Sequence, residues 1–333
     1  MKALVVERNL PRFVASRVAS LFGSGRGAGV GPLDLVDVAA PEPPGADWDH
    51  LQPLLSGICG SDLATLDGRS SRYFEDMVSF PFVPGHEVVG VLDDGGADHT
   101  GQALPPGTRV VVEPVLGCAP RRISPPCPYC SVGHTGLCPN VAFGDVAPGL
   151  QTGYCADTGG GWSAAGLVAH RSQIHQVPHS FSDEDAVMVE PAACAAHAVL
   201  SAAMDADAVV AVIGAGTLGL ATVAALHHLV RPSSPGTLMV GAKHPHQRQL
   251  AESLGADTAV APEHLARAVR RRSGSLVLAG RLIDGADVVF DCVGSSDSLA
   301  ASLAMVRPRG RVVVVGMPGR VSIDLAPLWH REL

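Results

Sequence analysis

The sequence has no surplus of basic residues. Its 24 lysines and arginines are outnumbered by 32 aspartates and glutamates, and the net charge is −8. Nucleic acids and anionic lipid surfaces attract clustered positive charge, so this balance argues against either as the main partner. The composition, 47% hydrophobic and 17% charged, also excludes a disordered chain and is typical of a folded protein.

Neither a signal peptide nor a membrane-spanning run is expected. The apolar run at the N-terminus is broken at Glu7, which is too early for a signal peptide. The longest apolar stretch, residues 206–230, contains three glycines, so a strand, a turn and a helix explain it better than a membrane span. We therefore expect a cytoplasmic protein with no membrane partner.

A chain of 333 residues is long enough for two domains. In the first half, glycine and proline clusters separate short apolar runs, which is typical of β structure with many turns. These runs are residues 3–6, 33–38, 88–92 and 108–112. In the second half, apolar strands alternate with helical stretches, the pattern of a parallel α/β sheet. The predicted strands are residues 209–213, 237–241, 258–260, 288–291 and 312–315.

A glycine-rich segment at residues 23–29 follows a helix-like stretch at 13–22. A phosphate-binding loop would have a strand before it and a helix after it. Neither is evident here, so we interpret residues 23–29 as a flexible surface loop.

A second glycine motif lies in residues 209–225, which predict a buried strand, a tight turn and an amphipathic helix in that order. Gly214 permits the turn, Gly216 lets the backbone approach a pyrophosphate, and Gly219 allows close packing of helix on strand. The helix N-terminus offers free N–H groups to the phosphates. The residues expected at the pyrophosphate are Gly214, Gly216, Thr217, Leu218 and Gly219. The alternative is a glycine turn with only a structural role.

The residues after the second predicted strand bear on the choice of cofactor. NAD-binding folds usually place Asp or Glu there to bind the ribose 2′-hydroxyl. No acidic residue occurs here between Asp207 and Glu252, and the strand is followed by Ala242, Lys243 and, further on, Arg248. Basic side chains would bind a 2′-phosphate, so NADP(H) is favoured over NAD(H). The alternative is that these cations are simply solvated.

Cysteine is concentrated in one part of the chain. Four of the eight cysteines fall in one short window: Cys118, Cys127, Cys130 and Cys138. Without a secretory signal, such clustering indicates metal ligation sooner than disulfides. Three others are interpreted as small buried hydrophobic residues: Cys155, Cys194 and Cys292.

Three further motifs precede the second glycine motif. They are Gly-Ile-Cys-Gly-Ser-Asp at 57–62, Pro-Gly-His-Glu at 84–87 and Val-Glu-Pro at 189–191. In this order and with the downstream nucleotide fold, they resemble the zinc-containing medium-chain dehydrogenases, the alcohol and polyol dehydrogenase superfamily. The resemblance covers most of the chain.

The resemblance implies an α/β protein of two domains. A GroES-like β-barrel catalytic domain would span residues 1–185, with a structural zinc lobe at about 113–140, and a Rossmann domain, a doubly wound parallel sheet, would span 186–333. The family's Rossmann sheet has a sixth strand, whereas five are predicted here. We therefore expect a fold truncated at the C-terminus, with Leu333 in an extended or poorly packed segment and an exposed sheet edge beside 312–315.

The resemblance makes Cys59 and His86 ligands of a catalytic zinc, with Glu87 beside them and Glu190 at the third protein position. A catalytic zinc takes three protein ligands and keeps one position open. Whether Glu87 or Glu190 ligates directly or through water stays open. In the family, a carboxylate in place of a second cysteine goes with polyol and sugar substrates.

The resemblance also implies the reaction. Zinc would polarise an alcohol oxygen and lower its pKa, and a hydride would pass from the carbinol carbon to the nicotinamide. Ser61 stands where the family takes the hydroxyl proton, so the expected catalytic residues are Ser61, Cys59 and His86. The family commonly continues the relay through a histidine three residues on. This chain has Ala64 there, and the relay beyond Ser61 stays open.

A second, structural zinc is implied by the cysteine window. The family spaces four cysteines as Cys-x2-Cys-x2-Cys-x7-Cys, and the last three match Cys127, Cys130 and Cys138. Ser124 occupies the first position, so we expect Cys118 to loop back and complete a four-cysteine site. The alternative is a lobe without zinc.

These motifs predict a zinc-dependent oxidoreductase that transfers a hydride between NAD(P) and an alcohol carbon of a small polyol or sugar-like molecule. Two alternatives stay open. One is a same-fold reductase of an unrelated carbonyl substrate, and the other is a non-catalytic or defective homologue that only binds zinc and cofactor. The family suggests a homodimer or homotetramer.

Overall fold

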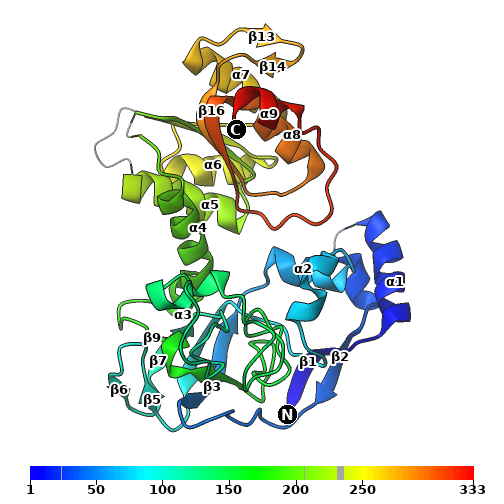
Figure 1. Cartoon of the computed structure of the whole chain (residues 1–333), viewed down its shortest axis with the longest axis vertical. Helices are drawn as coiled ribbons and strands as arrows, with labels where there is room; N and C mark the ends of the chain where they lie inside the picture. The colour runs from blue at the N-terminus through cyan, green and yellow to red at the C-terminus, as the bar shows by residue number, and fades with distance from the viewer. Residues whose placement is uncertain (24, 206, 231–235) are drawn as a thin grey trace. The chain divides into compact units, whose positions relative to one another are not determined.

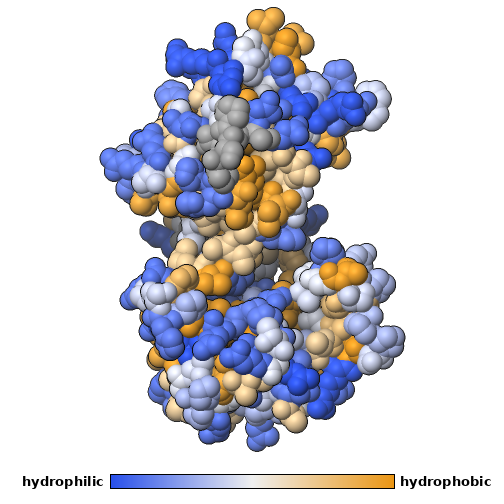
Figure 2. All heavy atoms as spheres, turned by 90° about the vertical axis from the view of Figure 1, so that its left-hand side faces the viewer, coloured by the Kyte–Doolittle hydropathy of each residue, from blue (hydrophilic) through white to orange (hydrophobic). Residues whose placement is uncertain are grey.

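The computed structural model describes residues 1–23, 25–205, 207–230 and 236–333 (Figure 1). The chain divides into two compact units, Met1–Glu190 and Pro191–Leu333. The division falls at the start of helix α4 (Val189–Ser201), a few residues after the predicted boundary at 185. Within the described residues, no helix is long and apolar enough to cross a membrane. The face drawn in Figure 2 is largely hydrophilic, with hydrophobic side chains in smaller groups.

The first unit is built on a five-stranded antiparallel sheet in the order β8-β3-β4-β7-β9. Its strands are β3 (Trp48–Ser56), β4 (Val88–Leu92), β7 (Arg109–Val112), β8 (Leu167–His170) and β9 (Ile174–Gln176). Two antiparallel pairs accompany it: β1 (Lys2–Val6) with β2 (Leu33–Asp37), and β5 (Gly96–Ala97) with β6 (Ala103–Leu104). Each of the four predicted runs overlaps one of these strands, so the β structure predicted for the first half is confirmed.

Apolar side chains cover both faces of this sheet. Val88 of β4 belongs to a buried cluster with Leu51 and Leu167. Its neighbour Val89 belongs to a second cluster with Ala186 of helix α3 (Asp183–Val187). Successive residues of a strand point to opposite faces, which is why both residues of the Val-Val pair are buried.

The first unit also contains helices α1 (Leu10–Ala19) and α2 (Gly60–Leu66). Short 3-10 segments complete it: η1 (Ser20–Phe22), η2 (Arg26–Gly29), η3 (Arg72–Met77), η4 (Cys130–Val132), η5 (Thr135–Leu137) and η6 (Arg171–Gln173). The prediction of a flexible loop at 23–29 is wrong, because η2 occupies most of this segment and Gly27 within it is buried. Ser24 lies outside the described residues.

A buried carboxylate explains this ordered turn. Asp67, at the end of α2, accepts hydrogen bonds from the N–H groups of Gly25 at 2.9 Å and Gly27 at 3.0 Å. A Cβ on Gly27 would lie 2.5 Å from the carbonyl oxygen of Leu66. The glycine is therefore required by close backbone approach and not by flexibility.

The second unit contains a five-stranded parallel sheet in the order β12-β11-β10-β15-β16. Its strands are β10 (Val209–Ile213), β11 (Thr237–Gly241), β12 (Thr258–Val260), β15 (Ala286–Asp291) and β16 (Val306–Val314), which confirms all five predicted strands. Its helices are α5 (Thr217–Ala225), α6 (Pro245–Ser253), α7 (Pro262–Ser273), α8 (Ser296–Met305) and α9 (Ala326–Arg331), with a π-helical turn η7 (Leu226–Val230) after α5. A separate hairpin pairs β13 (Val277–Leu278) with β14 (Arg281–Leu282).

Helices cover both faces of the parallel sheet. Val212 of β10 belongs to a buried cluster with Val223 of α5. The preceding residue, Ala211, belongs to the opposite cluster with Leu265 of α7. A strand buried on both faces must be apolar at every position, as the continuous run in β10 is.

The end of the chain differs from the prediction. Residues 326–331 form helix α9, and Arg331 donates to the carbonyl oxygens of Leu303 at 3.1 Å and Leu282 at 2.9 Å. Leu333 packs against the buried cluster that contains Leu265 of α7 and Met305 of α8. The expected extended or poorly packed end is therefore wrong. Strand β16 does lie at one end of the sheet, as predicted, and Val314 is 45% exposed.

The Asp67→Asn variant tests whether the buried carboxylate orders the glycine turn. Desolvation opposes ionisation, but the N–H donors of Gly25 and Gly27 and the guanidinium of Arg69 hold the pKa of Asp67 below its ordinary value. A pKa lowered in the folded state stabilises the fold above the unfolded-state pKa, and that contribution is lost as the pH falls below about 4. We expect Asp67→Asn to lower the free energy of unfolding in urea by about 1–3 kcal/mol at neutral pH, and by less in acid.

Asp76→Asn is the matched control, because Asp76 is an exposed carboxylate of the same unit. It should change the free energy of unfolding little at any pH. Equal losses in the two variants would contradict the role given to Asp67.

Candidate active site

The facing ends of β3 and β4 bring the first two motifs together. The strands pair antiparallel, with Ser56 opposite Val88. One residue further, the N–H of Gly57 donates to the carbonyl oxygen of Glu87 at 2.8 Å. A Cβ on Gly57 would lie 1.9 Å from Oε2 of Glu87, so glycine is needed there to make room for the carboxylate.

Cys59, His86 and Glu87 form a cluster whose possible ligand atoms all lie within 4.8 Å of one another. His86 is 4% exposed, and burial lowers its pKa against the opposing effect of Glu87, so the imidazole is neutral with a lone pair available. Burial raises the pKa of the Cys59 thiol, and a bound metal ion would displace its proton. A thiolate, an imidazole and a carboxylate are ligands that zinc accepts.

Sequence reasoning does not single out Asp62, yet this residue supports the cluster. Asp62 is 2% exposed, accepts a hydrogen bond from the N–H of Cys59 at 2.9 Å, and places Oδ1 3.6 Å from Nδ1 of His86. Burial raises its pKa to about 6, against the hydrogen bonds from Cys59 and from the Tyr154 hydroxyl at 3.3 Å. Its position beside Ser61 in the first motif is the only sequence signal for Asp62, and for Tyr154 there is none.

Ser61 is placed at the start of α2. Its hydroxyl oxygen is buried and has no partner in hydrogen-bond geometry among the described residues. It lies close to the Cys59 thiol and the Tyr154 hydroxyl. A buried hydroxyl of this kind is available to a ligand. Ala64, one turn further along the helix, offers no proton acceptor.

Glu190 lies in the first turn of α4, where the first unit ends. In the part of the chain that the structure describes, it does not join the group of ligand atoms within 4.8 Å, whose carboxylate comes from Glu87. The geometry of the first unit therefore favours Glu87 as the direct ligand, and a role for Glu190 stays a prediction.

The four cysteines of the predicted zinc lobe also come together. Their sulfurs all lie within 4.8 Å of one another, and Cys138 Sγ is 3.6 Å from that of Cys118 and 3.9 Å from that of Cys127. The N–H of Cys127 donates to Cys118 Sγ at 3.3 Å. Although burial opposes ionisation, such donors lower the pKa of the Cys118 thiol to about 7. Ser124 is exposed and takes no part in this cluster.

Arg121 anchors the loop that follows Cys118, and no sequence signal points to it. The side chain is completely buried. Its guanidinium donates to five carbonyl oxygens, those of Leu116, Phe143, Val146, Ala147 and Gly149. These bonds tie the loop to residues 143–149. The rigid guanidinium of Arg121 therefore holds in place the longer loop that separates Cys118 from Cys127.

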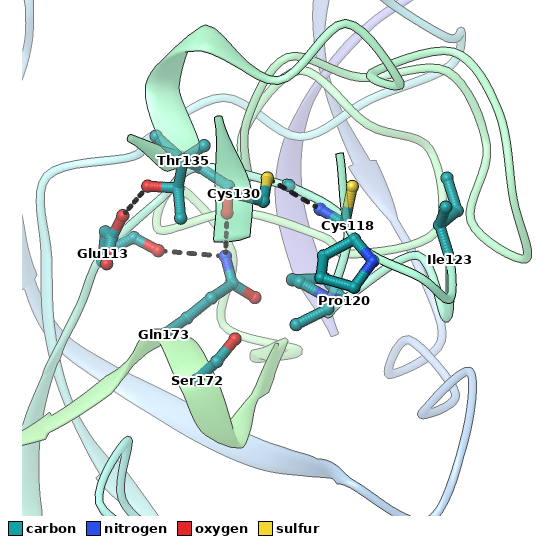
Figure 3. Close-up of a pocket in the computed structure, with 12 residues that line it drawn as sticks. Glu113, Cys118, Pro120, Ile123, Cys130, Thr135, Ser172 and Gln173 are labelled. Carbon is teal, nitrogen blue, oxygen red and sulfur yellow. Dashed lines mark hydrogen bonds between the residues drawn. The ribbon is translucent and has the colours of Figure 1, made fainter. Parts of the chain in front are cut away.

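A cavity of about 340 Å³ opens beside the four cysteines (Figure 3). Cys118 and Cys130 line it, and on its wall Thr135 donates to the carboxylate of Glu113 at 2.8 Å. None of the residues predicted for catalysis lines this cavity. It belongs to the cysteine lobe and not to the cluster around His86.

The glycine motif of the second unit has the geometry of a dinucleotide turn. Gly214 has a φ of +89°, and its N–H donates to the carbonyl oxygen of Gly241 at 2.9 Å. A Cβ on Gly219 would lie 2.1 Å from the carbonyl oxygen of Gly214, so close packing requires this glycine. A Cβ on Gly216 would meet nothing within 4 Å, which leaves open space beside the start of α5. Backbone N–H groups in a first helical turn, here at Thr217, have no partner within the helix.

Basic residues follow β11 as the sequence indicated. Arg248 donates through Nη1 to the carbonyl oxygens of Ala242 at 2.9 Å and Lys243 at 3.2 Å, which braces the loop. Ala242 is buried and Lys243 is exposed. The rings of His244 and His246 stack at 5.6 Å between centroids. Strands β10 and β11 pair in parallel, so the basic loop after β11 lies next to the glycine turn after β10.

Comparison with known proteins decides the family. Residues 50–179 match the alcohol dehydrogenase GroES-like domain, and residues 236–333 match the zinc-binding dehydrogenase domain. Sorbitol dehydrogenase of Arabidopsis thaliana is 30% identical over 279 residues, which cover 83% of this chain and 69% of that protein. The chain belongs to the zinc-dependent medium-chain dehydrogenase superfamily.

Other members of the superfamily support the same fold. D-arabitol-phosphate dehydrogenase of Enterococcus avium is 27% identical over 302 residues, covering 89% of this chain and 75% of that protein. The crystal structure of a protein assigned to the zinc-binding dehydrogenases, from Sinorhizobium meliloti and bound to NADP, has a TM-score of 0.69 at 27% identity, covering 92% of this chain and 81% of that one. The fold of this member is thus a GroES-like β domain followed by a Rossmann domain, as predicted.

The remaining cysteines agree only in part with their prediction. Cys155 is completely buried and Cys292 is half-buried, but Cys194 is exposed. Cys194 lies on helix α4, and its predicted burial is wrong. The helix buries one stripe that contains Ala195 and Val199, and Cys194 falls outside it.

The Cys118→Ser variant tests the displaced fourth cysteine of this superfamily member. We expect zinc content, measured by atomic emission, to fall and the Tm to drop by about 5–10 °C, because a structural zinc contributes folding free energy. Ser124→Ala is the matched control and should change neither quantity, since Ser124 is exposed outside the cluster. Full zinc content in Cys118→Ser would contradict a four-cysteine site.

Proposed function

We propose that this superfamily member is a zinc-dependent alcohol dehydrogenase that transfers a hydride between NADP(H) and a carbinol carbon of a polyol or sugar-like molecule. The observation that supports this most directly is the meeting of Cys59, His86 and Glu87 within 4.8 Å. A cofactor-binding shell without chemistry would have no need of three unlike ligands at one point.

The residues present fit a catalytic zinc ion. Cys59, His86 and Glu87 supply three protein ligands and leave one position for water or the substrate oxygen. Asp62 lies on the Nδ1 side of His86, so Nε2 is the nitrogen left to ligate. These residues would hold the ion so that its Lewis acidity would polarise the substrate oxygen and lower the pKa of the alcohol.

The side chains of the first unit hold and move the proton. Ser61 offers its buried hydroxyl to the substrate hydroxyl and accepts the proton that leaves it. Asp62 places Oδ1 3.6 Å from Nδ1 of His86, on the side of the ring away from the proposed ligating nitrogen. Ala64 stands in place of the family's histidine, so the onward acceptor from Ser61 would be water, the cofactor ribose or the nearby hydroxyl of Tyr154. The second unit would orient NADP+, which would supply the hydride acceptor.

Ligand chemistry and relatives support a polyol substrate. A carboxylate ligand makes the zinc site harder than a second thiolate would, which suits an oxygen-rich substrate. The relatives from Arabidopsis thaliana and Enterococcus avium are named for sorbitol and D-arabitol phosphate. We therefore place the substrate among linear polyols and related sugars.

The four-cysteine cluster would hold a second, structural zinc. Zinc with four thiolates carries a net negative charge, and a buried guanidinium needs compensating negative charge. Arg121 interacts electrostatically with Cys155 first and then with Cys138, Asp157 and Cys118, so the cluster would supply part of that charge. Zinc and arginine would in this way stabilise each other inside the lobe.

NADP(H) is the proposed cofactor. Lys243 and Arg248 follow β11, and no acid occupies the loop to repel a 2′-phosphate. The relative from Sinorhizobium meliloti was solved with NADP, whereas a more distant structure, from Escherichia coli, was solved with NADH. The basic loop of this chain is what supports the choice of NADP(H).

The experiment that tests the proposed function is a fluorescence assay of nicotinamide reduction across a panel of polyols, sugars and simple alcohols. We expect turnover with NADP+ on at least one linear polyol. A preference for an unrelated aldehyde would favour the carbonyl-reductase alternative. Zinc and NADP+ binding without turnover on any substrate would favour the non-catalytic alternative.

The Cys59→Ala variant separates zinc catalysis from folding. Lewis-acid assistance is worth several kcal/mol, so we expect kcat/KM to fall by at least about a hundredfold. Zinc content should fall by the catalytic ion alone, and the unfolding transition should shift little. Normal activity of Cys59→Ala after treatment with a chelator would show that zinc catalysis is wrong.

Cofactor choice is tested by Ala242→Asp and Lys243→Glu. An acid at either position repels a 2′-phosphate and can bind the ribose hydroxyl, so the ratio of kcat/KM for NADP+ to that for NAD+ should fall by about tenfold or more. Lys243→Gln, which removes the cation without adding an acid, should lower the ratio less. Tighter binding of NAD+ than NADP+ to the unmodified protein would refute the proposed preference.

A further inference from the structure

A basic groove lies on the second unit, at the edge of the parallel sheet. It has a volume of about 470 Å³, and its nine lining residues come from β11, β12 and α7. None of the lining residues is acidic, although the chain carries a net charge of −8. The glycine motif and the loop after β11 contribute nothing to it, so the groove is separate from the proposed cofactor site.

The floor of the groove is partly apolar. Val260 of β12 and Ala268 of α7 are half-buried and face the groove, and Met239 of β11, which is 2% exposed, lies beneath them. Thr258 lies beside Met239 in the register of the two strands, and its hydroxyl adds a polar group. Because β12 is the last strand on this side, the floor ends at the edge of the sheet. The groove can therefore hold a small molecule with an apolar part.

Three arginines of α7 form the wall. Leu265 and Val269 are buried against the sheet, and this fixes the orientation of the helix. Arg272 is anchored, since its Nε donates to Oγ1 of Thr237 at 2.6 Å. Neither Arg267 nor Arg271 makes an ion pair or a side-chain hydrogen bond with any described residue.

The dipole of α7 does not by itself account for the arginines that line the groove. Arginines in the last turn of a helix interact favourably with its dipole, and Arg270, Arg271 and Arg272 occupy that turn. Arg267 lies in the middle of the helix, where this effect has faded. Arg270 is equally basic but does not line the groove. Only the arginines on one side of the helix therefore face it.

We propose that this groove binds an organic phosphate monoester. Arg267 and Arg271 offer planar, unpaired guanidinium forks, which bind phosphate oxygens in a bidentate manner. Val260 and Ala268, both half-buried, would contact the organic part of the ester, above the buried Met239. The volume lies within the range of small-molecule sites. The proposal does not rest on the dehydrogenase reaction, because none of the residues assigned to zinc or to the cofactor takes part.

Calorimetric titration of the full chain with phenyl phosphate and with inorganic phosphate tests the groove, at physiological ionic strength. We expect phenyl phosphate to bind about tenfold more tightly than inorganic phosphate, because only the ester covers the apolar floor. The double variant R267Q/R271Q should weaken binding of phenyl phosphate by at least about tenfold. The matched control R270Q, on the same helix but outside the groove, should change it by less than about twofold.

A methyl NMR measurement locates the ligand independently of any variant. The chain has seven methionines, and the methyl resonance of Met239 can be assigned with the Met239→Leu variant. Phenyl phosphate should shift this resonance at lower concentrations than it shifts the other six. Equal weakening by R270Q would indicate diffuse attraction and overturn the proposal. So would unchanged affinity in R267Q/R271Q, an undisturbed Met239 methyl, or equal affinities for the two probes.

Discussion

The register of strands β3 and β4 shifts between Pro53 and Leu55, and beyond that irregularity Ser56 pairs with Val88 and the N–H of Gly57 donates to the carbonyl of Glu87. This pairing sets the distance between Cys59 on one chain segment and His86 with Glu87 on the other. The three residues lie just beyond the paired strands, so a slip of the pairing would move Cys59 relative to His86 and Glu87.

Buried charges recur around the loops of the first unit, and the backbone satisfies each of them. Asp62 accepts the N–H of Cys59, Asp67 accepts the N–H groups of the glycine turn, and Arg121 donates to five carbonyls of the cysteine lobe. An unpaired buried charge would be costly, and hydrogen bonds offset this cost to different degrees: the pKa of Asp67 is lowered, whereas burial still raises the pKa of Asp62 to about 6. In each case the charge orders an irregular segment that lacks the ladder of a helix or sheet.

Strand β11 serves two parts of the second unit. At its carboxyl end, Gly241 accepts the N–H of Gly214 and leads into the basic loop of the proposed cofactor site. Along its length, Met239 contributes to the floor of the groove beside α7. A parallel sheet with helices on both faces can support two such sites, because strand ends and strand faces are used separately.

The sequence by itself determined the parts of this protein that depend on local pattern. Apolar periodicity is read along a few consecutive residues, and it was enough to locate all five strands of the parallel sheet. The glycine turn at Gly214 could be predicted for the same reason, since its backbone conformation is a local property. Motif order was likewise enough for the family.

Tertiary structure alone decided which distant residues meet. The ordered turn at Gly27 depends on Asp67, and Asp62 and Tyr154, which come from separate segments, hydrogen-bond to each other beside His86. The packing of Leu333 likewise depends on contacts far away in sequence. Buried polar partners of this kind are chosen by the three-dimensional need to satisfy a charge or an N–H group, and no sequence period encodes that need.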